Sequence, residues 1–140
     1  MSRRLLLCVC AILLAGCRQE GPEARIRKAF AGSVRAVEAG DAAGAAEPLS
    51  PKFAGPEGMD RQQARLYLLG VLRGKKIGVT VLSEKLTVEG PRAEQTVDLL
   101  LTGRGGGELL PQDSSRRTLV LRWELRDGKW LIREIQTDSY

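Results

Sequence analysis

The spacing of the apolar residues changes once along this chain, near its middle, and this change constrains the fold more than any other feature. In the first half, apolar residues recur three or four positions apart, as in Ile26, Phe30 and Val34, which is the spacing of one helix face. From Ile77 onward they recur at every second position, which is typical of strands with one buried face. Helices followed by strands predict an α+β domain, with the helices packed on one face of an antiparallel sheet.

Capping residues divide the first half into three predicted helices. The first helix runs from Pro22, which suits a first helical position, to Gly40, which suits the end of a helix. Asp41 can cap a short second helix that follows directly. Asp60, with Gln63 three residues later, has the capping-box pattern and predicts the start of a third helix.

The second half is predicted to hold one bent strand followed by three others. The apolar residues of positions 77–81 and 86–88 alternate on opposite parities, so one regular strand cannot bury both sets on one face. Either a β-bulge near Ser83 bends a single long strand or a turn breaks it, and we favour the bulge. The remaining segments are a strand over 92–102, a loop over 103–115, and strands over 118–126 and 129–137.

The last two strands form a hairpin whose register follows from its turn. Asp127-Gly128 is a strong signal for a two-residue connection. The register that it predicts opposes Leu125 to Trp130, Trp123 to Ile132, and Arg122 to Arg133. The apolar pairs predict the buried face, while Glu124 or water would have to separate the two arginines on the other face.

The first sixteen residues are typical of a secretory signal peptide. Arg3 and Arg4 precede an apolar run over residues 5–14, which is about half of the roughly 20 residues that span a bilayer. The segment Leu14-Ala15-Gly16-Cys17 resembles the lipobox of bacterial lipoproteins, in which cleavage falls between Gly16 and Cys17 and the cysteine is acylated. The alternatives are a soluble secreted protein cut near Gly16 and an uncleaved anchor.

This resemblance implies a domain organisation and a cellular location. The segments would be a signal peptide over 1–16, a lipidated cysteine and short tether over 17–22, and a folded domain over 23–140. Acyl chains on Cys17 would hold the chain to a membrane without a transmembrane helix. By resemblance to the enterobacterial sorting rule, Arg18 after the anchor favours the periplasmic face of the outer membrane. Residues 18–21 extend over at most about 14 Å, so the domain would lie close to that membrane.

The placement of cysteine and histidine excludes several classes of function. The chain has no histidine, and its three cysteines, Cys8, Cys10 and Cys17, all lie in the first seventeen residues. The folded part therefore cannot hold a disulfide framework, a Cys/His zinc site or a histidine-dependent nucleophile. We expect no metal and no cofactor. Nucleic-acid binding is not expected either, because no basic stripe alternates with aromatic residues.

The order of helices, turns and strands resembles the nuclear transport factor two-like superfamily, also called SnoaL-like or cystatin-like α+β. The resemblance covers roughly Glu23 to Gln136. It is carried by Gly40-Asp41, by Leu49-Ser50-Pro51-Lys52-Phe53, and by a closing hairpin with the pattern Trp123-x-Leu125-x-x-Gly128-x-Trp130-x-Ile132. It implies a cone-shaped cavity between sheet and helices that serves as an active site or ligand pocket, or an open sheet face used for dimerisation. Fold alone does not choose among these uses.

Two residues are candidates for chemistry in such a cone. Members that resemble ketosteroid isomerase place an acid-base residue and hydrogen-bond donors in an apolar cavity. The hairpin register predicts that Glu134 shares the face of Trp123 and Trp130, and Tyr67 lies on the apolar stripe of the third helix. Glu134 could equally lie in water, and Tyr67 could be a core aromatic. The histidine-dependent dehydratase chemistry of the superfamily cannot apply to this chain.

The predicted loop carries a further candidate contact. Leu109 and Leu110 are adjacent apolar residues within a polar loop, so they could contact a partner, or they could fold back over the open end of the cone. The sequence therefore favours a non-enzymatic, membrane-anchored envelope lipoprotein that binds a protein partner, or a second copy of itself as a homodimer, through the sheet face or this loop. The alternative is a domain that binds or isomerises a small apolar ligand inside the cone.

Overall fold

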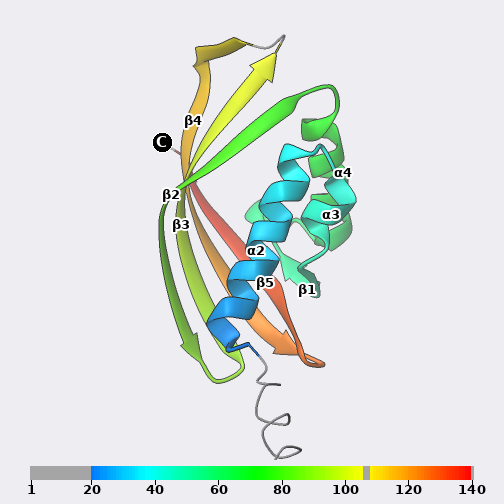
Figure 1. Ribbon diagram of the computed structural model, residues 1–140. Helices are drawn as coiled ribbons and strands as arrows, with labels where there is room; N and C mark the ends of the chain where they lie inside the picture. The colour runs from blue at the N-terminus through cyan, green and yellow to red at the C-terminus, as the bar shows by residue number, and fades with distance from the viewer. Residues whose placement is uncertain (1–19, 106–107, 140) are drawn as a thin grey trace, which may run out of the picture.

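A computed structural model of the chain describes residues 20–105 and 108–139 and has the predicted α+β architecture (Figure 1). Figure 1 shows all the α-helices on one side of a curved sheet, whose other face they leave uncovered. The sheet has five strands in the order β1-β5-β4-β3-β2. Within the described residues, no helix has both the length and the apolar character that a membrane crossing needs.

The three predicted α-helices are confirmed, together with their caps. Helix α2 spans Pro22–Glu38, and the chain turns after it at Gly40, which has a φ of 74° that favours glycine. Helix α3 spans Ala42–Ala46, and the Asp41 side chain accepts a hydrogen bond of 3.0 Å from the Gly44 amide.

The third helix begins with the predicted capping box. Helix α4 spans Arg61–Leu72, and Asp60 and Gln63 exchange the two side-chain to backbone hydrogen bonds of that motif. Two elements that the sequence did not indicate precede it. Strand β1 spans Leu49–Ala54, and a short 3-10 helix, η1, spans Pro56–Gly58.

The four long strands form an antiparallel meander. Their bounds are β2 Lys76–Glu89, β3 Arg92–Gly105, β4 Glu108–Arg126 and β5 Lys129–Ser139. The predicted bulge in the first long strand is confirmed, because the β2–β3 register shifts between Val81 and Ser83. Strand β1 adds to the edge of the meander by pairing in parallel with β5.

The predicted loop over residues 103–115 is wrong. Strand β3 continues to Gly105 and β4 begins at Glu108, and Arg104 pairs with Leu109. The glycines and Pro111 disfavour a regular strand locally, but antiparallel pairing resumes beyond a register shift between Thr102 and Arg104. The side chains of Leu109 and Leu110 lie outside the described part of the structure, so their contacts stay a prediction.

The core fills the space between the helices and the covered face of the sheet. Ile26 of α2 and Val97 of β3 are fully buried, and Trp123 of β4 is 1% exposed. The Trp123 indole nitrogen donates to the Gln95 side-chain oxygen at 3.1 Å, and Gln95 is itself fully buried. The remaining core members are Phe30, Ala46, Leu49, Phe53, Ala64, Ala93, Leu99, Leu121, Trp130 and Ile132.

Candidate functional site

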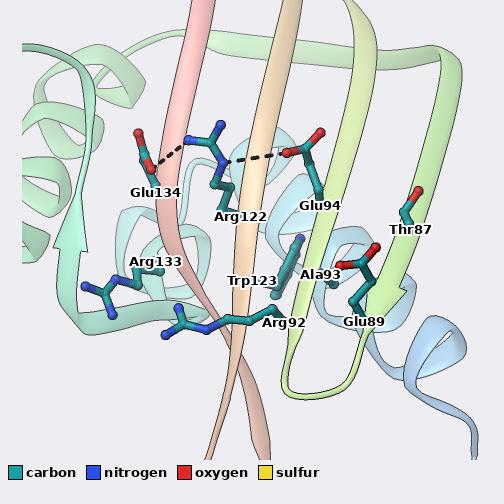
Figure 2. Close-up of a pocket in the computed structure, with 9 residues that line it drawn as sticks. All are labelled: Thr87, Glu89, Arg92, Ala93, Glu94, Arg122, Trp123, Arg133 and Glu134. Atoms are coloured by element: carbon teal, nitrogen blue, oxygen red, sulfur yellow. Dashed lines mark hydrogen bonds and ion pairs between the residues drawn. The ribbon is translucent and has the colours of Figure 1, made fainter.

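The uncovered face of β2 to β5, called the open face below, carries a connected set of charged side chains. It presents the residues that alternate with the buried ones along each strand, because successive side chains of a strand point to opposite faces. Figure 2 shows several of these residues on strands β3, β4 and β5, around a groove with a volume of about 460 Å³. The groove is lined by Thr87, Glu89, Arg92, Ala93, Glu94, Arg122, Trp123, Arg133 and Glu134.

One row of the open face is an ion ladder across three strands. Arg122 is paired with Glu94 of β3 and Glu134 of β5 in the strand registers. Its guanidinium lies 2.9 Å from the Glu134 carboxylate and 3.6 Å from that of Glu94 (Figure 2). The hydrogen bond to Glu134 is the main reason why the pKa of Arg122 is raised. Gln136 also donates a hydrogen bond of 3.0 Å to Glu134, so two neighbouring side chains fix the Glu134 carboxylate on this face.

The neighbouring row contains a buried carboxylate. Glu124 is 6% exposed and accepts a hydrogen bond of 2.6 Å from the hydroxyl of Ser50, which is fully buried on strand β1. The Ser50 hydroxyl is the main cause of a lowered pKa of Glu124, and the nearby guanidinium groups act in the same direction. Glu124 therefore stays ionised although it is buried.

Three arginines from three strands surround this one carboxylate. Arg126, Arg133 and Arg92 lie 3.2, 3.4 and 3.8 Å from its oxygens, and we call them, with Glu124, the arginine cluster. Arg92 and Arg133 also line the groove of the open face (Figure 2). Since one carboxylate cannot neutralise three guanidinium groups, the cluster retains positive charge beside the groove.

A further acidic residue of the open face, Asp98, is held by hydroxyl groups. Asp98 accepts hydrogen bonds from Thr118 at 2.5 Å and Ser83 at 2.9 Å, and Arg116 lies 3.5 Å away. The Thr118 hydroxyl is the main cause of its lowered pKa. The open face therefore combines fixed carboxylates with partly exposed arginines, an arrangement suited to binding a charged surface. Within the described residues, no group of three or more acidic side chains is arranged to hold a metal ion.

The predicted position of Glu134 is wrong, and a bulge explains why. Trp123 pairs with Ile132 as expected, but the register then shifts, so Arg122 pairs with Glu134 and not with Arg133. One extra residue in β5 moves every later side chain to the other face. Glu134 therefore lies on the open face, whereas Trp123 and Trp130 are buried in the core.

Tyr67 does not lie in the core either. Its side chain is 60% exposed on α4, next to Leu66, which is also 60% exposed, while Ala64 and Leu72 are the buried residues of that helix. The structure thus does not bring Tyr67 and Glu134 together as a pair enclosed by apolar side chains. Residues 1–16 and Cys17, on which the predicted signal peptide and anchor depend, lie outside the described residues.

Sequence reasoning missed the arginine cluster as a site. The alternation of Arg122, Glu124 and Arg126 was visible along one strand, and the predicted hairpin did bring Glu124 near Arg133. Ser50 and Arg92 lie far away in the sequence, and no local pattern links them to Glu124. The cluster could have been predicted only with knowledge of the strand order, which brings β1 and β3 close to Glu124.

Comparisons with known proteins identify the fold and no more. No protein-family model and no curated protein matches the chain. An uncharacterised protein with a cystatin-like fold from Caulobacter vibrioides superposes with a TM-score of 0.69 at 16% identity, over 84% of this chain and 89% of that one. An NTF2-like protein of unknown function from Pseudomonas putida gives a TM-score of 0.69 at 11% identity, over 86% and 89% of the two chains.

A third solved structure, Aln2 from a Streptomyces species, superposes with a TM-score of 0.72 at 10% identity, over 87% of this chain and 94% of that one. These identities are low, so the similarity shows the fold alone. The chain has the cystatin-like, NTF2-like fold that the resemblance implies.

Proposed function

We propose that this chain is a membrane-anchored, non-enzymatic binding domain of the bacterial cell envelope that holds a protein partner against its open face. The observation that carries the proposal is the arginine cluster, in which three guanidinium groups surround the single carboxylate of Glu124 beside an open groove. The planar, forked donors of arginine suit the carboxylates of acidic side chains. The expected partner is therefore a protein that presents Asp or Glu side chains to the arginine cluster.

The anchor is a separate part of this proposal and rests on Cys17 after a short apolar leader. Cells fed a labelled fatty acid should incorporate the label into the wild-type chain and not into a Cys17→Ser variant, because the thiol is the expected acylation point. A Cys8→Ser variant is the matched control and should keep the label, since Cys8 would leave with the signal peptide. Label that persists in the Cys17→Ser variant would contradict the anchor.

The open face can be tested by photo-crosslinking in cells. A photoreactive residue at Thr87, which lines the groove, should give one adduct of defined mass, whereas the same residue at Gln62, exposed on α4, should not. Replacing Arg92 by Glu should reduce the Thr87 adduct at least fivefold by adding a repelling charge. Arg65→Glu, the same change on α4, is the control and should leave the adduct intact.

The outcomes separate the possible partners. An adduct of twice the chain mass would identify a homodimer instead of a different protein. Crosslinks from Gln62 alone, or equal loss with Arg92→Glu and Arg65→Glu, would refute the open face as the binding surface. Loss of the adduct in a variant with both Leu109→Ser and Leu110→Ser would instead assign a role to the segment 103–115.

A further inference from the structure

A second groove lies on the helix side of the molecule, away from the open face. It lies between α2, α3 and the start of β5, has a volume of about 480 Å³, and is called the hairpin groove below because Lys129 and Trp130 of the β4–β5 hairpin form one wall. Its lining residues are Arg25, Lys28, Ala29, Gly32, Ser33, Gly44, Glu47, Pro48, Lys129, Trp130 and Leu131. The hairpin groove shares no residue with the groove of the open face.

The hairpin groove carries an excess of positive charge. Arg25, Lys28 and Lys129 line it, and Glu47 is the one acidic residue among its lining residues. Among the residues that the structure describes, none of these four side chains takes part in an ion pair. The Arg25 guanidinium donates to the Gly128 backbone oxygen, a neutral acceptor that fixes its position and leaves its charge unbalanced. The hairpin groove therefore presents three positively charged side chains to an anion.

The wall of the hairpin groove also contains an unpartnered donor. Trp130 is 6% exposed, and its indole N–H is buried and has no acceptor within the described part of the chain. A buried N–H without an acceptor is costly, and most such groups are satisfied in proteins. Trp130 lines the groove, but its indole nitrogen lies beneath the surface, so the side chain would have to rotate toward the groove before an oxygen atom of a ligand could supply the missing acceptor. Ala29, Pro48 and Leu131 add apolar surface beside it.

The position of the hairpin groove points to a membrane. Figure 1 shows the described chain beginning next to the β4–β5 hairpin, at the same end of the molecule as the first turns of α2. If Cys17 is acylated, the four residues between it and Pro22 hold this end within about 14 Å of the bilayer. Basic groups so close to a membrane are attracted by anionic lipids.

We propose that the hairpin groove binds the phosphate-containing headgroup of an anionic glycerophospholipid and so fixes the orientation of the domain on its membrane. The phosphate would lie among Arg25, Lys28 and Lys129, and a rotation of the Trp130 side chain toward the groove would let its indole N–H donate to one of the phosphate oxygens. The orientation would leave the open face free for a partner. The membrane setting rests on the proposed function, but binding of the headgroup can be measured without the anchor.

The test uses the chain from Cys17 onward with Cys17→Ser, so that no acyl chain contributes. The core residues of the described structure all lie from Ile26 onward, so this chain keeps the core. Glycerol 1-phosphate should shift the indole N–H resonance of Trp130 in nuclear magnetic resonance spectra, and leave that of Trp123, which is bonded to Gln95, in place. The same protein should bind vesicles of phosphatidylglycerol and not vesicles of phosphatidylcholine.

Matched variants distinguish binding in the hairpin groove from general attraction between a basic protein and anionic lipids. Lys28→Gln combined with Lys129→Gln should weaken binding to phosphatidylglycerol vesicles at least tenfold. Lys75→Gln combined with Lys76→Gln removes the same charge at the start of β2, at the other end of the sheet, and should change binding less than twofold. A β-carbon at Gly32 meets nothing within 4 Å, so Gly32→Glu should place a carboxylate in the groove and abolish binding, while Gly32→Ala should retain it.

Three results would overturn the proposal. Equal losses in the two lysine pairs would mean that only net charge matters. An indole resonance of Trp130 that moves with neither glycerol 1-phosphate nor phosphatidylglycerol vesicles would show that neither ligand binds in the hairpin groove. Binding of glycerol 1-phosphate without binding of phosphatidylglycerol vesicles would identify a soluble phosphate ester, and not a lipid, as the ligand. The labelling of Cys17 is measured separately, so a missing anchor cannot be mistaken for any of these results.

Discussion

Replacing Trp123 by alanine is expected to lower the free energy of unfolding by about 4 kcal/mol, a large share of the roughly 5–15 kcal/mol that holds a typical domain together. Trp123 is 1% exposed and lies opposite Ala93 of β3 and Ile132 of β5, so its removal leaves a cavity in the centre of the core. It also takes the donor away from the oxygen of Gln95, which is fully buried. An unpaired buried polar group adds about 1–3 kcal/mol to the cost of the cavity.

Urea unfolding followed by circular dichroism measures this change. Trp123→Phe is the matched variant for the hydrogen bond, because it keeps most of the apolar volume, and it should cost about half as much. Leu66→Ala is the control for truncation of an apolar side chain at the surface, since Leu66 is 60% exposed, and it should change stability by no more than about 0.5 kcal/mol. Equal midpoints for Trp123→Ala and Leu66→Ala would refute the assignment of Trp123 to the core.

The features of the fold that the sequence predicted are those that depend on a few neighbouring residues. The capping box of Asp60 and Gln63 and the Asp41 cap are short-range hydrogen bonds, and both are present in the structure. The Asp127-Gly128 turn fixes its own hairpin, so Leu125 does oppose Trp130. The bulge in β2 was predictable because the apolar parity changes there.

The bulge in β5 was not predicted, although a weaker form of the same parity signal marks it, with one apolar residue after the change. The bulge in β5 falls where Ile132 is followed by Arg133, Glu134 and Ile135, a run in which the apolar residue is displaced by one position. Several apolar and charged patterns fit such a run, and only packing against β4 selects one of them. This bulge matters for the candidate site, because Glu134 was predicted to face the cone and instead pairs with Arg122 on the open face.

Strand β1 and the arginine cluster were not predicted because both depend on pairing between segments that are far apart in the sequence. Leu49–Ala54 is short and contains a proline, so its local preference for a strand is weak, yet β5 offers it a free edge for parallel pairing. That pairing brings Ser50 to Glu124, 74 residues away in the sequence. The candidate site is therefore a product of topology, and its strongest hydrogen-bond partner belongs to an element that local patterns do not reveal.

Glu124→Gln is expected to lower the free energy of unfolding by about 2 kcal/mol at pH 7, the scale of a buried hydrogen bond to a charged group. Gln can still accept from Ser50, but it no longer offsets the repulsion among Arg92, Arg126 and Arg133, which lie 3.2–3.8 Å from the carboxylate. Glu134→Gln is the control, because Glu134 is more exposed and pairs with a single arginine, and it should cost no more than about 1 kcal/mol.

The same substitution should change how stability depends on pH. The pKa of Glu124 is lowered from its ordinary value of 4.5 by the Ser50 hydroxyl and the arginines, so the folded chain binds this proton less readily than the unfolded chain. Its contribution is therefore complete above about pH 4.5 and is lost as the pH falls through the lower, folded-state pKa. Urea midpoints between pH 7 and pH 3 should fall less steeply for Glu124→Gln than for the wild type. Asp98 also has a lowered pKa, so it contributes to the fall of the urea midpoint with decreasing pH in both the wild type and Glu124→Gln. Adding Asp98→Asn to Glu124→Gln should therefore make the midpoint depend still less on pH. Parallel acid slopes for Glu124→Gln and the wild type would show that the arginine cluster does not hold this carboxylate in its charged form.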